Sequence, residues 1–150
     1  LQPQVNIRDI VVGQGACTDS AWATQYHLPG TFAPIADYTM LRTCVETAEQ
    51  LGLPYHVGNL LSSDRFYGDD GDMPDGWKAN TAWAKLGVLA VEMEAAALYM
   101  NAARAGKRAL AVCTVSDHLV KQEFTTSEER QTGFTQMMQL ALETAVKLEK

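Results

Sequence analysis

Three carboxylates stand at the ends of segments that are otherwise apolar enough to enter the protein interior. Glu92 and Glu94 fall inside the run GVLAVEMEAAALYM (87–100), and Asp117 closes the run RALAVCTVSD (108–117). Burying an unpaired carboxylate costs on the order of several kcal/mol. Acids at these positions are therefore expected to hold a ligand or a partner group.

The spacing of Glu92 and Glu94 is compatible with two roles. If the strand continues through Glu94, both side chains point to the same side and Met93 points to the other. A helix that begins near Ala95 would place a carboxylate at its N-terminus, which is a stabilising position. Ligand binding by Glu94 and simple capping of that helix are equally compatible with the spacing.

Four short, apolar and β-branched segments predict strands, and helical patterns separate them. The strands are expected at 9–18, 55–63, 87–92 and 108–117. Nearly unbroken apolar runs indicate strands that are covered on both faces. The alternation predicts an α/β fold, a three-layer α/β/α sandwich with a largely parallel or mixed central sheet. Ligands of such sheets bind at the carboxyl ends of strands, so Glu92, Glu94 and residues 116–118 are expected to share one crevice.

Two helices carry recognisable end signals. Asp37 can cap a helix that runs to Leu51, with Gly52 as its stop. The last helix opens with a capping box formed by Thr126 and Glu129 and is expected to continue to the C-terminus. Its expected core-facing stripe consists of Phe134, Met137, Met138, Leu142 and Val146.

The composition argues for one domain with neither a nucleic-acid surface nor a membrane span. The 150 residues are 47% hydrophobic, which is enough to form a core. A net charge of −6 with scattered Lys and Arg argues against phosphate-backbone binding. No apolar run is long enough to span a bilayer, and residues 1–9 lack the features of a signal peptide. A cytoplasmic location is therefore expected.

The side chains most often found in metal sites have a structural context in this sequence. Cys17, Cys44 and Cys113 show no disulfide or zinc spacing and are expected to be reduced structural thiols. The acidic segment at 67–77 lacks EF-hand spacing and predicts a solvated surface loop. We expect no metal site, and we expect His118 to be structural.

Five motifs of the chain resemble those of one enzyme family. They are GQGACTDS (13–20), FAPIADY (32–38), VEMEAA (91–96), CTVSDH (113–118) and TTSEERQTGF (125–134). Together they resemble the bacterial, hexamer-forming type of purine nucleoside phosphorylase, from Asp9 to the C-terminus. VEMEAA with a following SD is shared across the wider superfamily of nucleoside phosphorylases and nucleosidases. The pair Asp117 and Arg130, thirteen residues apart, is typical of the purine branch.

The resemblance implies how the sugar and the base are bound. Glu94 matches the carboxylate that accepts hydrogen bonds from the ribose 2′ and 3′ hydroxyls, a role that suits an ionised acceptor with two oxygens. Met93 matches the residue that lies against the sugar, and Glu92 belongs to the same nucleoside-contacting triplet. Val91 and Phe66 match residues that form the purine slot.

The resemblance also implies a proton donor. Asp117 matches the general acid that protonates N7 of the purine, which requires a protonated carboxyl group, a form that burial favours. Ser116 would contact the base. Arg130 matches a residue that swings in to pair with Asp117 and stabilises the carboxylate left behind. Without the resemblance, an exposed Arg130 paired with Glu128 or Glu129 is the favoured interpretation.

The implied reaction is phosphorolysis of purine (deoxy)ribonucleosides to free base and (deoxy)ribose 1-phosphate, a purine-salvage reaction. Phosphate is the co-substrate, and no cofactor is expected. The family's phosphate-binding glycine-rich turn and arginines precede the region that matches here, as do a His and an Arg supplied by a neighbouring subunit. Residues 1–150 therefore match the C-terminal portion of a single nucleoside phosphorylase domain and are expected to be inactive alone. Exposed sheet edges favour a homo-oligomer, a hexamer in the family, or association with the N-terminal part.

Two alternatives remain open at this point. A hydrolytic nucleosidase of the same superfamily would use water in place of phosphate. A non-catalytic remnant would bind nucleosides or only assemble. Phosphate dependence of base release distinguishes the first alternative, and nucleoside binding without turnover identifies the second.

Overall fold

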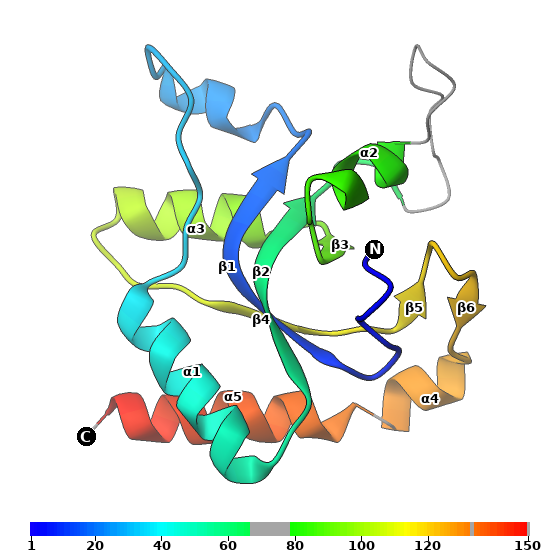
Figure 1. Ribbon diagram of the computed structural model, residues 1–150. Coiled ribbons are helices and arrows are strands. Elements are labelled where there is room, and N and C mark those ends of the chain that lie inside the picture. The colour runs from blue at the N-terminus through cyan, green and yellow to red at the C-terminus, as the bar shows by residue number, and fades with distance from the viewer. Residues whose placement is uncertain (67–78, 133, 150) are drawn as a thin grey trace.

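A four-stranded sheet forms the centre of the computed structural model, which describes residues 1–66, 79–132 and 134–149 (Figure 1). The strands are β1 (Ile10–Thr18), β2 (Tyr55–Ser62), β3 (Ala90–Glu92) and β4 (Ala111–Thr114). Their order is β3-β2-β1-β4, in which β1, β2 and β3 run parallel and β4 is antiparallel to β1. All four predicted strands are present, and the sheet is mixed, as expected.

The sheet is curled, and an irregularity in β1 lies where it bends. The pairing of β1 with β2 shifts register between Gly13 and Gly15, as in a β-bulge, which bends a strand and increases its twist. A Cβ at Gly13 would meet Leu60 Cδ1 at 2.6 Å, so only glycine allows this close approach. The Tyr99 hydroxyl donates to the Gly13 carbonyl at 2.6 Å and accepts from the Ala111 amide at 3.0 Å. This buried phenol ties β1 to β4 at the bend.

Helices cover both faces of the sheet and produce the predicted three layers. The helices α1 (Tyr38–Leu51) and α5 (Thr135–Leu148) pack together on one face, and α3 (Ala95–Arg104) packs on the other (Figure 1). Successive β1 side chains point to opposite faces. Ile10 accordingly joins the core beneath α1 and α5, whereas Val11 joins the core beneath α3.

The ends of α1 follow the predicted signals. The Asp37 side chain accepts a hydrogen bond from the Met40 amide at 2.9 Å and so caps the helix. Gly52 ends it with a φ of 66°, in the left-handed region that favours a residue without Cβ. Cys44 and Ala48, on the face of α1 that joins the core, are fully buried.

The C-terminal region forms two helices, so the prediction of one continuous helix is wrong. The first is α4 (Ser127–Thr132), and the second is α5. The predicted capping box is confirmed at the start of α4. The Glu129 amide donates to Thr126 Oγ1 at 3.2 Å, and the Thr126 amide donates to Glu129 Oε2 at 2.9 Å.

The predicted core-facing stripe of the last helix is also largely wrong. Met138, Leu142 and Val146 are 50%, 69% and 51% exposed. The buried face of α5 instead contains Leu140 and Thr144, with Met137 packed beside Leu140. A helix whose apolar residues spread around its circumference can dock on more than one face, and contact with α1 selects this one.

Four further elements were not predicted. They are the 3₁₀ helix η1 (Trp22–Tyr26), the helix α2 (Ala79–Lys85), and the strands β5 (Asp117–His118) and β6 (Glu123–Phe124). The expected strand at 108–117 thus ends early, and Asp117 belongs to a separate two-stranded ribbon. The predicted loop at 67–77 lies outside the described residues.

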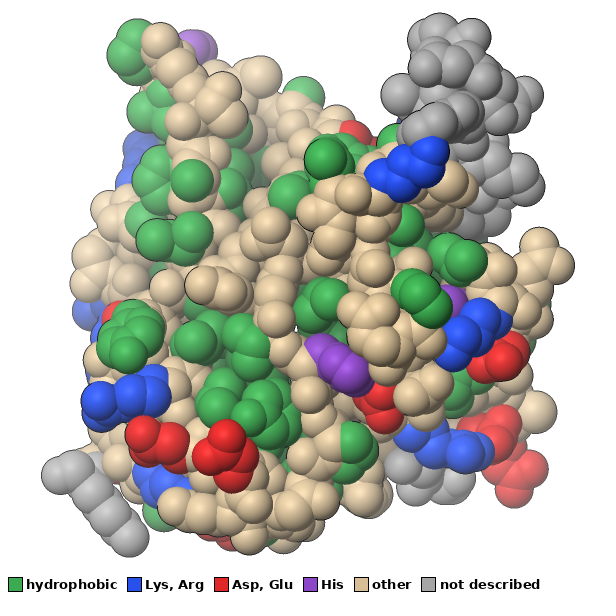
Figure 2. Space-filling model, viewed as in Figure 1, with side chains coloured by type: hydrophobic (Ala, Val, Ile, Leu, Met, Phe, Trp, Pro, Cys, Tyr) green, Lys and Arg blue, Asp and Glu red, His purple; other side chains and the backbone are tan. Residues whose placement is uncertain are grey.

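The surface shows no grouping of basic side chains on the face seen in Figure 2. Lys and Arg side chains are interspersed there with Asp and Glu (Figure 2). The part of the chain that the structure describes contains no helix with the length and apolar character needed to cross a membrane.

Candidate functional site

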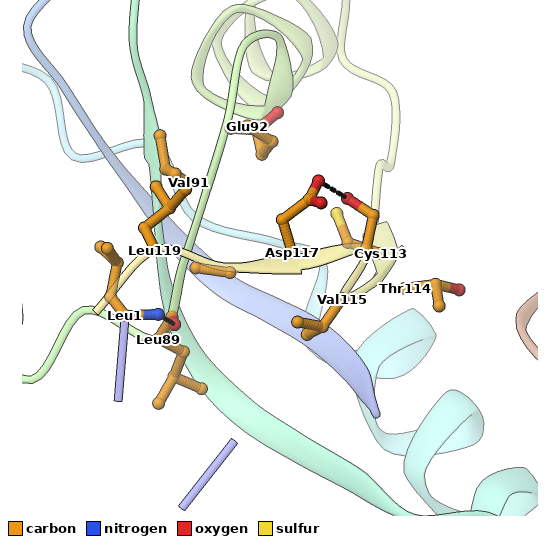
Figure 3. Close-up of a pocket in the computed structure, with 11 residues that line it drawn as sticks. Leu1, Leu89, Val91, Glu92, Cys113, Thr114, Val115, Asp117 and Leu119 are labelled. Atoms are coloured by element: carbon orange, nitrogen blue, oxygen red, sulfur yellow. Dashed lines mark hydrogen bonds between the residues drawn. The ribbon is translucent and has the colours of Figure 1, made fainter. Parts of the chain in front are cut away.

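A pocket of about 140 Å³ lies between the two outer strands of the sheet. Although β3 and β4 are not neighbours in the sheet, residues of both reach this pocket (Figure 3). Its lining consists of Leu1, Leu89, Ala90, Val91, Glu92, Cys113, Thr114, Val115, Ser116, Asp117 and Leu119. Among the described residues, the lining contains two carboxylates and no Lys or Arg side chain.

The meeting of Glu92 with Asp117 was predicted, but strand direction is not its cause. The prediction placed both acids at the carboxyl ends of strands in a largely parallel or mixed sheet. Because β4 is antiparallel to β1, its carboxyl end lies beside the start of β1, with Thr114 opposite Ile10. The curl of the sheet, together with the short segment after β4, brings Asp117 to the pocket.

Asp117 is a largely buried carboxylate surrounded by donors. Its side chain is 15% exposed. Ser116 Oγ donates to Oδ2 at 2.7 Å (Figure 3), and the Thr125 amide donates to Oδ1 at 3.3 Å. Arg130 Nη2 donates to the same Oδ1 at 3.0 Å. The carboxylate can therefore be held in place from both sides while it faces the pocket.

Arg130 reaches Asp117 from α4, outside the pocket lining. Its Nε donates to Thr125 Oγ1 at 3.1 Å and its Nη2 to the Thr125 carbonyl at 3.0 Å, which orients the guanidinium. The pairing with Asp117 that the resemblance implies is therefore present. The alternative pairing with Glu129 is wrong, because Glu129 forms its ion pair with Arg8. Hydrogen bonds from the Thr126 amide and hydroxyl, together with the charge of Arg8, lower the pKa of Glu129.

Glu92, rather than Glu94, provides the carboxylate at the start of α3. Glu92 Oε2 accepts hydrogen bonds from the amides of Glu94 and Ala95, both at 2.7 Å. The Glu94 side chain makes no capping hydrogen bond, so the alternative in which it simply caps the helix is wrong. The strand ends at Glu92 instead of continuing through Glu94, because the Glu92 carboxylate draws the following amides into a turn.

Ser62 completes this arrangement and was missed by the sequence analysis. It is the last residue of β2 and is 4% exposed. Its hydroxyl donates to Glu92 Oε1 and accepts the Ala96 amide at 2.8 Å. The rule that placed ligands at strand ends would have pointed to Ser62 as well, since it is the last residue but one of the predicted strand at 55–63.

Three of the predicted substrate-binding residues lie outside the pocket lining. Met93 is 38% exposed and Phe66 is 73% exposed, and Glu94 is also exposed. Val91 and Ser116, together with Glu92, do line it. The described structure thus brings Val91, Glu92, Ser116 and Asp117 together in one pocket. Met93 and Glu94 directly follow Glu92 in the sequence but do not line this pocket.

Cys113 reports on the electrostatics of the pocket. Burial, followed by the charges of Glu92 and Glu94, raises the pKa of this thiol to about 11. Glu94 therefore acts electrostatically on the pocket, although it does not line it. A thiol with such a pKa is neutral near pH 7 and is not a nucleophile. Cys17, Cys44 and Cys113 are all free, in agreement with the prediction.

His118 has the structural role that the sequence analysis predicted. It is 1% exposed. Its Nδ1 accepts a hydrogen bond from the Lys121 amide at 3.0 Å, so Nε2 carries the proton and donates to the Gln2 carbonyl at 3.0 Å. Both ring nitrogens are used to fix the segment around β5.

This combination of a mixed, curled sheet with a pocket between its outer strands agrees with a match to a known family. The family model described as the phosphorylase superfamily matches residues 1–148. The chain belongs to the phosphorylase superfamily. Membership supports a nucleoside phosphorylase or nucleosidase type of function, in which a glycosidic bond to a base is cleaved.

Proposed function

We propose that this chain carries the nucleoside-binding and proton-donor part of a purine nucleoside phosphorylase. The observation that supports this most directly is the contact between Asp117 and Arg130, 3.0 Å apart at the side of the pocket. Purines offer N7 as a site for protonation, and pyrimidines have no such atom. An acid in the position of Asp117 is therefore suited to a purine leaving group.

Proton transfer assigns different roles to Asp117 and Arg130. A protonated Asp117 gives its proton to N7 as the glycosidic bond breaks, which makes the purine a better leaving group. Arg130 remains charged at neutral pH and stabilises the carboxylate that forms. Ser116, which already contacts Asp117, is a polar neighbour for the base.

The sugar and the base occupy the β3 side of the site in this proposal. Glu94 accepts hydrogen bonds from the ribose hydroxyls, since its carboxylate is exposed and makes no capping bond. Met93 lies against the sugar, and Val91 and Phe66 form the purine slot. Glu92 serves the same site through its contacts with the backbone that carries Glu94.

Phosphate is bound by residues other than the described ones that line the pocket, because these include no Lys or Arg. A phosphate dianion needs several preorganised donors. We propose that these donors come from a chain segment outside these 150 residues or from a neighbouring subunit of a homo-oligomer, and that the 150-residue chain alone is inactive. We also place the reaction in purine salvage in the cytoplasm, with no cofactor.

The lack of cations among the described lining residues also favours a second candidate, a hydrolytic nucleosidase that uses water. The test is release of base from inosine, adenosine and uridine by the complete protein, with and without phosphate. Purine release that saturates with phosphate is expected. Base release at the same rate with and without phosphate would favour the nucleosidase. Faster cleavage of uridine than of inosine and adenosine would overturn purine specificity.

A further inference from the structure

Ser62 is a buried hydroxyl placed between three elements of the site. It closes β2, donates to Glu92 at the end of β3, and accepts the Ala96 amide in the first turn of α3. With an exposed fraction of 4%, it is shielded from solvent. Its oxygen is engaged as both donor and acceptor, so it is not a free nucleophile.

Both carboxylate oxygens of Glu92 accept hydrogen bonds from the protein, one of them from Ser62. Oε1 accepts from Ser62, and Oε2 accepts from the amides of Glu94 and Ala95. Charge-assisted hydrogen bonds of this kind at a helix N-terminus are strong and directional. They fix the turn at Met93 and Glu94 in one conformation and leave the Glu94 side chain without a capping duty.

We propose that Ser62 is a positioning residue for sugar recognition, acting through Glu92 to hold the backbone from which Glu94 reaches the ribose. This inference rests on the proposed function, in which Glu94 accepts hydrogen bonds from the 2′ and 3′ hydroxyls. Ser62 touches no substrate in this role. Its loss lets the turn relax, and the Glu94 carboxylate leaves its position.

The consequence is specific to the sugar. A 2′-deoxyriboside offers only the 3′ hydroxyl to Glu94, whereas a riboside offers two hydroxyls. Displacement of Glu94 therefore penalises ribosides more than 2′-deoxyribosides. A general loss of folding or of proton transfer reduces the cleavage of both substrates by the same factor, so the ratio of the two isolates the positioning role.

Ser63 provides a matched control. It is likewise buried, 6% exposed, and its hydroxyl donates to the Asp19 carboxylate at 2.9 Å and accepts the Arg65 amide at 3.1 Å. Ser63→Ala thus removes the same kinds of side-chain hydrogen bond from the neighbouring residue and leaves the hydrogen bonds of the Glu92 carboxylate in place.

The experiment compares kcat/KM for inosine and 2′-deoxyinosine in the complete protein with saturating phosphate. Ser62→Ala is expected to lower the ratio of inosine to 2′-deoxyinosine about tenfold, as expected for one lost hydrogen bond to a charged group. Ser63→Ala should leave the ratio within about twofold. Adding Ser62→Ala to Glu94→Gln should lower the ratio little further, because both changes remove the same interaction.

Glu92→Gln serves as the second variant if Ser62→Ala does not fold, and it should lower the same ratio. An unchanged ratio in both variants, with cleavage retained, would overturn the inference and leave the proposed function intact. Absence of nucleoside cleavage by the unaltered protein would overturn both.

Discussion

Glu92 and Asp117 line the same pocket but are held in different ways. The partners of Glu92 are two amides at the start of α3 and a buried serine at the end of β2. The partners of Asp117 include the side chain of Arg130, which is 48% exposed and belongs to the short helix α4. Helix amides cannot move away unless the helix unwinds, whereas an exposed arginine can leave without disturbing the core. Glu92 is thus held by backbone amides and a buried hydroxyl, whereas one partner of Asp117 is an exposed side chain that can leave.

The difference fits the two tasks of the proposed reaction. Recognition of sugar hydroxyls depends on a fixed acceptor, and the turn from β3 into α3, which Glu92 holds, supplies the framework for one. Proton transfer changes the charge of a carboxyl group, and a partner that can approach and leave suits that change. Substitutions at the two sites test whether Glu92 and Asp117 are held differently.

The largest expected effect comes from Asp117→Asn. An asparagine can still form a hydrogen bond to N7 but cannot transfer a proton, so kcat should fall about 10²–10⁴-fold for purines that are poor leaving groups. The loss should be smaller for nucleosides whose bases leave easily. A leaving-group series measured on the complete protein tests this, and equal losses across the series would contradict the general-acid role.

The second-largest expected effect is a difference in the free energy of unfolding between variants of Glu92 and Asp117. Glu92→Ala removes the acceptor for two amides and for Ser62, and it should lower the free energy of unfolding by about 2–3 kcal/mol. Asp117→Ala should cost about 1 kcal/mol or less, because its arginine partner is half exposed. Urea unfolding of both variants measures the contrast. Equal losses of stability would mean that Asp117 is held as firmly as Glu92.

Glu94→Gln separates ligand binding from helix capping. The amide keeps the shape and loses the charge, so riboside binding should weaken by about 1.5–3 kcal/mol. Because the Glu94 side chain makes no capping hydrogen bond, the unfolding midpoint should stay unchanged. Calorimetric titration with inosine, combined with thermal unfolding, gives both values. Unaltered riboside affinity would remove Glu94 from the sugar site.

The smallest expected effect concerns the exposed ion pair of Arg8 with Glu129 on α4. The pKa of Glu129 is lowered in the folded protein, so its contribution to stability is present at neutral pH and is lost as the pH falls through that lowered pKa. Arg8→Ala should therefore reduce the stability slightly at pH 7 and leave it unchanged at about pH 2, where Glu129 is uncharged. Urea midpoints at the two pH values test this, and an equal loss at both would show that Arg8 acts through packing.

The sequence predicts the elements of this fold better than their directions. Apolar runs identified all four sheet strands, and cap residues identified both ends of α1. A short apolar run carries no information on whether β4 runs parallel or antiparallel to β1, because that depends on the connection and on the curl. The division of the last helix into α4 and α5 was missed because the capping box marks a start and says nothing of an early end.

The candidate site shows the same limit at the level of single residues. The acids at 92 and 117 were recognisable because carboxylates are out of place beside apolar runs. Whether Glu94 caps α3 depended on where β3 ends, and because β3 ends at Glu92 it is the Glu92 carboxylate that accepts the first amides. Ser62 escaped notice because a serine at a strand end is common, and its importance lies in contacts with segments thirty or more residues away.

The curl of the sheet also bears on aggregation. Within the described sheet, β3 and β4 each pair with one neighbour only and have three and four residues. A long, flat strand edge with unpaired amides and carbonyls is a template for pairing with other chains. Here both edges are short, and residues of both line a common hollow instead of extending a flat ribbon outward. Among the described residues, the two edges of the curled sheet thus offer a neighbouring chain only three and four residues of strand to pair with.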